Sequence, residues 1–443
     1  MKKPEMPPAS VRKMMDSKDA TELMKLGKWD DFVKISRDEY PYWEELKYKI
    51  KEWQIEPGKV WEMIKNTRSY NQQYIQPSKL NGFYFSFSTP GFLQRDLHEL
   101  DMNLGGTLQS ESIIPSEDKD RYLISSIMEE AIASSQLEGA VTTRKVAREL
   151  LEKDKKPQNR SERMISNNYD TMRWIVQNKD QKLTPEVLLS IHSLIAKDTL
   201  EDKGDEGAFR NNDDITVNED ISGEVFYIPP SHQHIDQLIK DFCTFANDEN
   251  KHNVFVHPII KGIVLHFLIG YIHPFTDGNG RTARAIFYWY LIRKGYWLIE
   301  YMSVSRIILK AKAQYARAYL YTEYDDNDLT YFVIYNIKAI KAALEDLKKY
   351  IRKKTEEKQN TLALVKHTNF NDRQIVLIKD VLQDRNQYFT VKQIELRFNV
   401  SNQTARTDLI TLAEKGILQQ RTTGRKAQFF ATDDFEKQLN TKK

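Results

Sequence analysis

Apolar residues recur at intervals of three and four along most of the chain, which is the spacing of one buried face of an α-helix. Helix starts carry ordinary signals, such as Thr184-Pro185, where Thr caps the first turn and Pro takes the first helical position. The pattern predicts a mainly α fold with helices at about 121–137, 143–153, 161–176, 185–194, 235–245, 258–269, 280–293, 305–324 and 330–354.

One segment within this helical region has the pattern of a β-hairpin. Strand-forming residues at 215–217 and 225–228 flank a polar turn that contains Gly223. The pattern of residues 1–105 predicts a helix-rich N-terminal extension. Within it, only 83–88 shows enough alternation of apolar and polar residues for a short strand or an extended arm.

The C-terminal part has a pattern of its own. A charged run at 352–360 predicts a linker, which we place at 351–370. Residues 371–435 then predict three short helices followed by a strand and a hairpin, an arrangement that resembles a winged helix-turn-helix. DNA contacts would come from the third helix and the hairpin tip, through Gln403, Thr404, Arg406 and Arg425. Winged helices also serve as protein-interaction modules, so the sequence leaves DNA and protein partners open.

Composition narrows the setting of the protein. The chain has 443 residues, enough for two or three domains, and a net charge of +3, too small to predict general binding to nucleic acid or a membrane. Cys243 is the single cysteine, which excludes an internal disulfide and a thiolate metal site. The sequence begins without an apolar signal core, and no run approaches the ~18–20 apolar residues of a spanning helix. We therefore expect a cytoplasmic protein without a membrane partner.

The segment from His273 to Arg284, H-P-F-T-D-G-N-G-R-T-A-R, holds the candidate chemistry. His273 is a candidate general base, and Asp277 is an oxygen ligand suited to Mg²⁺. The Gly278-Asn279-Gly280 turn leaves backbone N–H groups uncovered at the start of a predicted helix, where the helix dipole also favours an anion.

Two arginines extend this anion site. Arg281 and Arg284 are three residues apart and share one face of the predicted helix. Their guanidinium groups suit the oxygens of a phosphate through forked, charge-assisted hydrogen bonds. The segment therefore predicts a Mg²⁺–nucleotide site with a base beside it.

The same string resembles the signature of Fic-domain proteins, HPFx(D/E)GNGRxxR, at every fixed position. Members of this family mostly transfer AMP from ATP to a hydroxyl side chain of a target protein. The resemblance implies that His273 deprotonates the target hydroxyl and that Asp277 holds Mg²⁺. It also implies an anion hole for the α- and β-phosphates formed by Gly278, Asn279, Gly280 and Arg281, with Arg284 orienting the γ-phosphate. The hairpin at about 207–230 would be the flap that aligns the target by strand addition.

A second family motif lies upstream. Ser134-x-x-x-Glu138-Gly139 resembles the inhibitory motif (S/T)xxxE(G/N) of Fic proteins and ends the helix at about 121–139. The resemblance implies that Glu138 pairs with Arg284 and so removes the partner of the γ-phosphate. From residue types alone, Glu138 is an acid in the last turn of a helix, which the helix dipole disfavours, and a solvated glutamate remains the alternative.

These features define our expectation for the whole chain. It is a mainly α protein with an N-terminal extension (1–105), a Fic-type helical core with a β-hairpin flap (106–350), a linker (351–370) and a small α+β winged helix (371–435). Its function would be auto-inhibited, Mg²⁺-dependent adenylyl transfer from ATP to a hydroxyl of a target protein. Modification of the chain itself and homodimerisation, both frequent in the family, stay open.

Two alternatives remain. Relatives of this family also use other phosphate-containing donors or remove AMP, although the Arg281–Arg284 pair favours ATP. An alternative of another class is a DNA-binding regulator whose Fic core acts as a nucleotide sensor.

Overall fold

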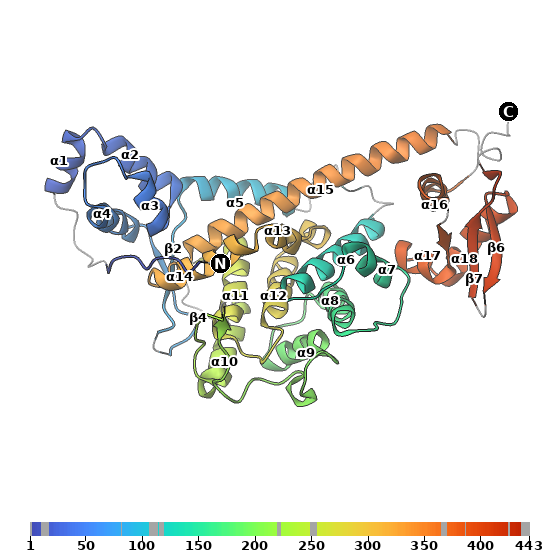
Figure 1. Cartoon of the computed structure of the whole chain (residues 1–443), viewed down its shortest axis with the longest axis horizontal. Helices are drawn as coiled ribbons and strands as arrows, with labels where there is room; N and C mark the ends of the chain where they lie inside the picture. The colour runs from blue at the N-terminus through green and yellow to red at the C-terminus, as the bar shows by residue number, and fades with distance from the viewer. Residues whose placement is uncertain are drawn as a thin grey trace.

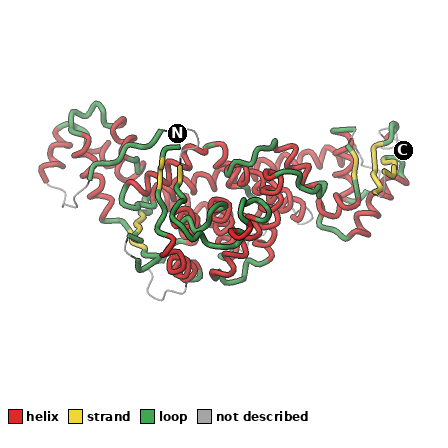
Figure 2. The backbone as a smooth tube through the Cα atoms, turned by 60° about the horizontal axis from the view of Figure 1, so that its bottom comes forward, coloured by secondary structure: helices red, strands yellow, loops and turns green. Residues whose placement is uncertain are grey.

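The structure is a computed structural model that describes residues 2–9, 17–80, 82–105, 114, 119–218, 223–248, 255–364, 370–385, 387–423 and 426–435. The molecule is elongated, with a helical unit at one end, a large helical core in the middle and a small helix-and-sheet unit at the other end (Figure 1). Helices dominate, and the strands are few and short (Figure 2). The predicted mainly α fold is confirmed.

The N-terminal helices form a unit with its own aromatic core. This core also takes in Tyr321 and Tyr331 from the central part, and the ring of Tyr42 stacks on that of Tyr321 with centroids 3.8 Å apart. The unit is therefore fixed to the core by shared packing. Its elements are α1 (Ser17–Lys25), α2 (Trp29–Lys34), the π-helical η1 (Ile35–Glu39), α3 (Trp43–Lys49) and α4 (Pro57–Ser69).

Buried acids strengthen this attachment. Asp328 is fully buried and accepts a hydrogen bond of 2.6 Å from the hydroxyl of Tyr40. Asp325 pairs with Lys65 at 2.8 Å. Asp325 and Asp328 thus join the two units. The described residues contain no group of three His, Cys, Asp or Glu side chains that could hold a metal ion.

The central core surrounds α11 (Pro258–Ile272), whose residues from Ile259 to Ile269 are all buried. A helix that is apolar on every face can only be stable inside a shell of other helices. The shell consists of α5 (Gly91–Leu104), α6 (Lys119–Leu137), α7 (Arg144–Glu152), α8 (Arg160–Gln177), α9 (Pro185–Ala196), α10 (Ile235–Ala246), α12 (Asn279–Arg293), α13 (Val304–Lys310), α14 (Lys312–Tyr324) and α15 (Thr330–Leu364), with 3₁₀ turns η3 (Lys203–Asp205), η4 (His232–His234) and η5 (Trp297–Tyr301).

Two short hairpins complete the core. β1 (Gln73–Ile75) pairs antiparallel with β2 (Phe85–Phe87), so the segment at 83–88 contains a strand. β3 (Val217–Asn218) pairs with β4 (Val225–Tyr227) at the predicted hairpin, whose turn residues 219–222 lie outside the described residues. The apolar side chains of β2 and α5 pack into the central core rather than into the N-terminal unit.

The C-terminal unit has a separate core and a three-stranded antiparallel sheet in the order β5-β7-β6. Side chains of Asn371, Thr390 and Ser401 cap its three helices. The elements are α16 (Asp372–Gln383), β5 (Tyr388–Phe389), α17 (Val391–Phe398), α18 (Asn402–Glu414), β6 (Leu418–Thr423) and β7 (Lys426–Ala431).

Two predicted boundaries differ from the structure. Residues 351–364 were expected to belong to a linker, but α15 continues through them to Leu364. The buried Leu347 and Ile351 hold the helix to the core, and the Lys and Glu residues that follow are good helix formers. The helix expected at 305–324 is interrupted at Ala311, which has φ −135° and ψ 41° and separates α13 from α14.

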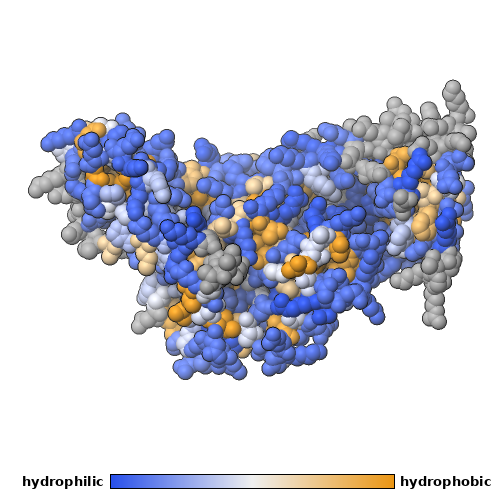
Figure 3. Space-filling model, in the orientation of Figure 1, coloured by the Kyte–Doolittle hydropathy of each residue, from blue (hydrophilic) through white to orange (hydrophobic). Residues whose placement is uncertain are grey.

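Among the described residues, no helix combines the length and the apolarity needed to cross a membrane. The face in Figure 3 is largely hydrophilic, with apolar residues in small separate patches.

Candidate functional site

The candidate base lies where the central helix ends. His273 follows α11 in the left-handed conformation, with φ 49° and ψ 58°, which turns the chain out of the core. Its Nδ1 lies 3.1 Å from the carbonyl oxygen of Gly270. Because a carbonyl only accepts, Nδ1 carries the proton in the neutral ring, and Nε2 is left with a free lone pair. Burial lowers the pKa of His273 below its usual value of 6.5, so the neutral form prevails near neutral pH.

The side chain of Asn279 bridges the loop after His273. Asn279 accepts a hydrogen bond of 3.0 Å from the N–H of Phe275 and donates one of 2.8 Å to its carbonyl. The amide side chain of Asn279 therefore shapes the loop.

This loop leads into an uncapped helix start. Gly278 adopts φ 86°, a conformation that favours glycine, and no side chain caps the first turn of α12. The first N–H groups of α12 therefore form the kind of end that binds anions.

Arg281 adds a buried positive charge to this helix start. Its side chain is fully buried, and one nitrogen donates to the carbonyl of Ile195 at 3.2 Å. Within the described part of the chain, its Nε and one terminal nitrogen have no hydrogen-bond partner. A buried guanidinium with unused donors is costly unless an anion accepts from them, which fits a phosphate at this position.

Arg284 is held by the end of α6. Its Nε donates to the hydroxyl of Ser134 at 2.8 Å, and a terminal nitrogen donates to the carbonyl of Ser134 at 2.9 Å. The same nitrogen lies 3.0 Å from the carboxylate of Glu138. The structure thus brings both residues of the upstream motif onto Arg284. Glu138 also covers Gly280, since a Cβ built there would lie 2.2 Å from its Oε1.

Asp277 lies at the rim of the site. Its carboxylate is 2.9 Å from Arg160 and 3.5 Å from Arg281. One exposed carboxylate alone does not make a metal site, but Mg²⁺ commonly binds through one or two carboxylates together with the phosphates of a substrate. The donor set therefore fits Mg²⁺ that arrives with a nucleotide.

Three further residues shape the loop, and the sequence analysis assigned none of them a role. Arg160 binds Asp277, as described above. His192 stacks on Phe275 with ring centroids 3.7 Å apart, accepts from the N–H of Gly207 at 3.1 Å and donates to the carbonyl of Asp277 at 2.9 Å. Burial lowers the pKa of His192 to about 4, so its ring stays neutral.

Arg210 connects the flap to the loop. It is buried and donates from Nε to the carbonyl of His273 at 2.9 Å and also to the carbonyl of Pro230. Its partner in the loop is 63 residues away in sequence, so local patterns carry no signal of this contact. On β4, the second strand of the flap, the hydroxyl of Tyr227 donates to the carbonyl of Tyr271 at 2.9 Å.

Three of the four winged-helix candidates, Gln403, Thr404 and Arg406, lie far from this site, on α18 at the end of the molecule (Figure 1). Gln403 and Arg406 are exposed, and Thr404 is half-buried beside Ser401. Arg425 lies outside the described residues. The structure therefore keeps the two groups of site residues in separate units.

Comparison with known families agrees with both units. Residues 182–291 match the model of the Fic/DOC family. Residues 373–427 match the model of the DeoR-like helix-turn-helix domain.

Curated relatives resemble only a short part of the chain. Protein adenylyltransferase fic-1 of Caenorhabditis elegans is 34% identical over 70 residues, which are 16% of this chain and 13% of that protein. Protein adenylyltransferase Fic of Drosophila melanogaster is 37% identical over 70 residues, 16% of this chain and 14% of that protein. The chain thus matches about one seventh of the length of these relatives.

Solved structures of similar arrangement include a Fic family protein from Desulfovibrio desulfuricans, with a TM-score of 0.46 and 18% identity over 77% of this chain and 95% of that chain. Fic-1 from C. elegans, residues 134–508, has a TM-score of 0.46 and 17% identity over 76% of this chain and 86% of that chain.

Because Glu138 contacts Gly280, replacing Gly280 should destabilise the native protein but stabilise a protein that lacks Glu138. Gly280→Ala should lower stability by about 1–2 kcal/mol, because the new Cβ displaces the Glu138 carboxylate. In a Glu138→Gly background the same substitution should raise stability by about 0.5–1 kcal/mol, since alanine favours a helix over glycine. Denaturant unfolding of the four proteins measures both effects, and an equal effect in both backgrounds would show that Glu138 does not cover Gly280.

Proposed function

Since residues 182–291 form a Fic/DOC family domain, we propose that this protein is a protein adenylyltransferase that moves AMP from ATP to a hydroxyl side chain of a target protein. The observation that carries the proposal is the combination of a neutral His273 with the unused donors of the buried Arg281 at an uncapped helix start. Transfer of this kind depends mainly on positioning and charge stabilisation, and the site provides both.

His273 would act as the base. Its Nε2 takes the proton of the target hydroxyl as the hydroxyl oxygen bonds to the α-phosphorus of ATP. The bond between that phosphorus and the bridging oxygen breaks, and pyrophosphate leaves with the electron pair. Gly278, Gly280 and Arg281 would accommodate the phosphates, with Asn279 holding the loop in shape.

Asp277 would hold Mg²⁺, which would offset charge on the phosphates. Arg284 would orient the γ-phosphate.

We further propose that Glu138 inhibits this reaction. In the structure its carboxylate occupies a donor of Arg284 and lies against Gly280. A γ-phosphate would meet a like charge there and would lose its partner, so ATP would bind out of line for transfer. Ser134 would keep Arg284 in place when Glu138 withdraws, because Ser134 accepts two hydrogen bonds from the guanidinium and Glu138 accepts one.

The target would dock on the flap. Val225 on its second strand and Ile228 directly after that strand are 42% and 70% exposed, which suits strand addition by an extended segment. The target hydroxyl could belong to another protein or to this chain, and a homodimer would allow one copy to modify the other.

Removing Glu138 tests both proposals. Glu138→Gly should raise AMP transfer about 10²-fold, because the γ-phosphate then pairs with Arg284 and aligns the α-phosphate. The measurement compares ATP labelled at the α- or the γ-phosphate, followed by intact-mass analysis, with His273→Ala as the control. Incorporation of the α label and a mass gain equal to AMP support the proposal. Equal rates for mutant and native protein contradict inhibition, and retention of only the γ label indicates a kinase.

The base assignment predicts a pH profile. Neutral His273 is the active form, so activity is lost as pH falls through its pKa, which burial places below 6.5. Glu138 raises that pKa, so its removal lowers the midpoint further. Initial rates of Glu138→Gly over about pH 5–8 should therefore show an acid limb with its midpoint below 6.5. A midpoint above 6.5 would contradict this role for the buried ring.

Two variants of the enzymatic proposal keep the same fold. The enzyme could use another phosphate-containing donor, or Glu138 could direct water to remove AMP from a modified target. The labelling experiment separates these from adenylyl transfer.

DNA binding by the winged helix is a second proposed function. It is supported by the match to the DeoR-like helix-turn-helix model and by the exposed Gln403 and Arg406 on α18. The whole protein would then be a regulator whose Fic core senses a nucleotide.

Loss of one charge on α18 tests this second function. Arg406→Ala should weaken binding of a duplex selected from a random pool by about 10-fold. Arg37→Ala, which removes an equal charge from the exposed surface of the N-terminal unit, is the matched control. Titrations at several salt concentrations measure the affinities, and a binding constant independent of salt and of Arg406 rules out this use of α18.

A further inference from the structure

The candidate inhibitory residue lies at the tip of a helical hairpin. α6 ends at Leu137, Glu138 and Gly139 form the turn, and α7 runs back antiparallel from Arg144 to Glu152. We call α6, the turn and α7, residues 119–152, the inhibitory hairpin.

One buried acid fastens the two helices of the hairpin together. Glu129 on α6 accepts two hydrogen bonds from Arg144, at 2.6 and 2.7 Å, and one from Arg148 at 3.0 Å. Such forked pairs hold side chains in fixed geometry. Glu129 therefore joins the two helices of the hairpin side by side.

The base of this hairpin, opposite its tip, carries the winged helix. α17 packs against both α6 and α7. Asn399, which ends α17, donates to Asp120 in the first turn of α6 at 3.4 Å. At the other arm, the ammonium of Lys153 lies 4.5 Å from the ring centre of Tyr388 on β5. The winged helix thus contacts the end of each arm.

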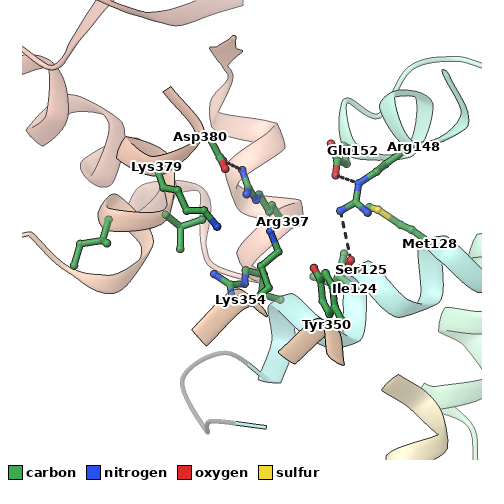
Figure 4. Close-up of a pocket in the computed structure, with 13 residues that line it drawn as sticks. Ile124, Ser125, Met128, Arg148, Glu152, Tyr350, Lys354, Lys379, Asp380 and Arg397 are labelled. Carbon is green, nitrogen blue, oxygen red and sulfur yellow. Dashed lines mark hydrogen bonds and ion pairs between the residues drawn. The ribbon is translucent and has the colours of Figure 1, made fainter. Parts of the chain in front are cut away.

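Charged side chains line a cleft between the hairpin and the winged helix (Figure 4). Arg397 of α17 and Arg148 of α7 line opposite sides of it, with Glu152 and Asp380 among the lining residues. Glu152 pairs with Arg148 at 2.7 Å, and Asp380 pairs with Arg397. Burial opposes the charge on Arg397, yet Asp380 and Glu152 keep its pKa above the usual value. Glu152 therefore offsets the repulsion between arginines that face each other across the cleft.

We propose that the winged helix regulates the inhibitory hairpin, so that docking at its base holds Glu138 on Arg284 and undocking weakens that contact. The inference rests on the proposed inhibitory role of Glu138. The base and the tip are connected by one continuous helix, whose path from Ser125 to Leu137 is about 18 Å. Displacement of the base by a partner of the winged helix would thus reach the nucleotide site.

The core limits the size of this effect. Asn168 of α8 donates to the carbonyl of Ala131 at 3.2 Å, and Ser135 donates to the carbonyl of Met164 at 3.1 Å. These contacts hold the tip half of α6 whether or not the winged helix is docked. Undocking should therefore shift the position of Glu138 partially, by less than its complete removal.

Charge reversal at the base tests the linkage in the full-length protein. Glu152→Lys places a third cation between Arg148 and Arg397, while a lysine at the last residue of α7 suits the helix dipole and leaves the hairpin folded. Lys153→Ala is a second undocking variant. Glu52→Lys makes the same charge change as Glu152→Lys at an exposed position of the N-terminal unit and is the matched control.

The readout is the affinity for a non-hydrolysable ATP analogue relative to that for ADP, measured by calorimetry. Only the analogue carries a γ-phosphate, so this ratio reports how freely Arg284 can be reached, whether or not transfer occurs. Hydrogen exchange in 391–398 reports undocking. The ratio should rise about 5-fold in Glu152→Lys and in Lys153→Ala, and remain unchanged in Glu52→Lys. In a Glu138→Gly background, neither undocking variant should raise it further.

Two results would overturn the inference. One is faster exchange in 391–398 with an unchanged ratio, which means that undocking does not reach Arg284. The other is unchanged exchange in both variants, which means that these contacts do not hold the winged helix. If the affinity ratio rises as expected but the protein transfers no AMP, the proposed reaction is wrong, while the linkage between the winged helix and Glu138 still holds.

Discussion

The buried guanidinium of Arg284 is the constraint on which the site depends. Placing a cation inside a helical core costs free energy unless hydrogen bonds and opposite charge surround it. Here the hydroxyl and the carbonyl of Ser134 and the carboxylate of Glu138 provide them, all from the end of α6. The packing of α6 against the core therefore also fixes the position of Arg284 in the candidate site. A ligand with a negative charge can replace Glu138 but leaves the two contacts of Ser134 in place.

Arg281 presents the opposite situation three residues earlier on the same helix. Its guanidinium is fully buried and leaves donors unused among the described residues. Ser134 and Glu138 satisfy Arg284. Among the described residues the Nε of Arg281 has no hydrogen-bond partner, and one of its terminal nitrogens has only the Asp277 carboxylate at 3.5 Å, although both arginines extend from the first turns of α12. Their difference arises from neighbouring helices, because α6 reaches Arg284 whereas α9 offers Arg281 only the carbonyl of Ile195. Such unsatisfied buried groups are rare in stable cores and are typical of binding sites.

The helices around this site connect it to the rest of the molecule. α11 is apolar on all faces and can lie only at the centre, so its end delivers His273 to a fixed position. Arg210 and His192 then hold the loop from two sides, through backbone carbonyls rather than through other functional side chains. At the other end of α6, the winged helix packs on the base of the inhibitory hairpin. The loop after His273 and the winged helix are therefore neighbours of one helix at its two ends.

The sequence by itself determined the helical fold, the flap hairpin, the winged helix and the identity of the motif residues. Those features are local, since periodicity, capping residues and a contiguous motif act over a few residues. It also paired Glu138 with Arg284, but only through resemblance to a family. The sequence did not predict the continuation of α15 to Leu364, because the charged residues that favour a helix are also common in linkers. Only the tertiary structure showed that the loop is held by His192, Arg210 and Arg160. It also showed that α17 packs against the inhibitory hairpin. These contacts join residues that are dozens to hundreds of positions apart, and no local pattern encodes which distant surfaces will meet.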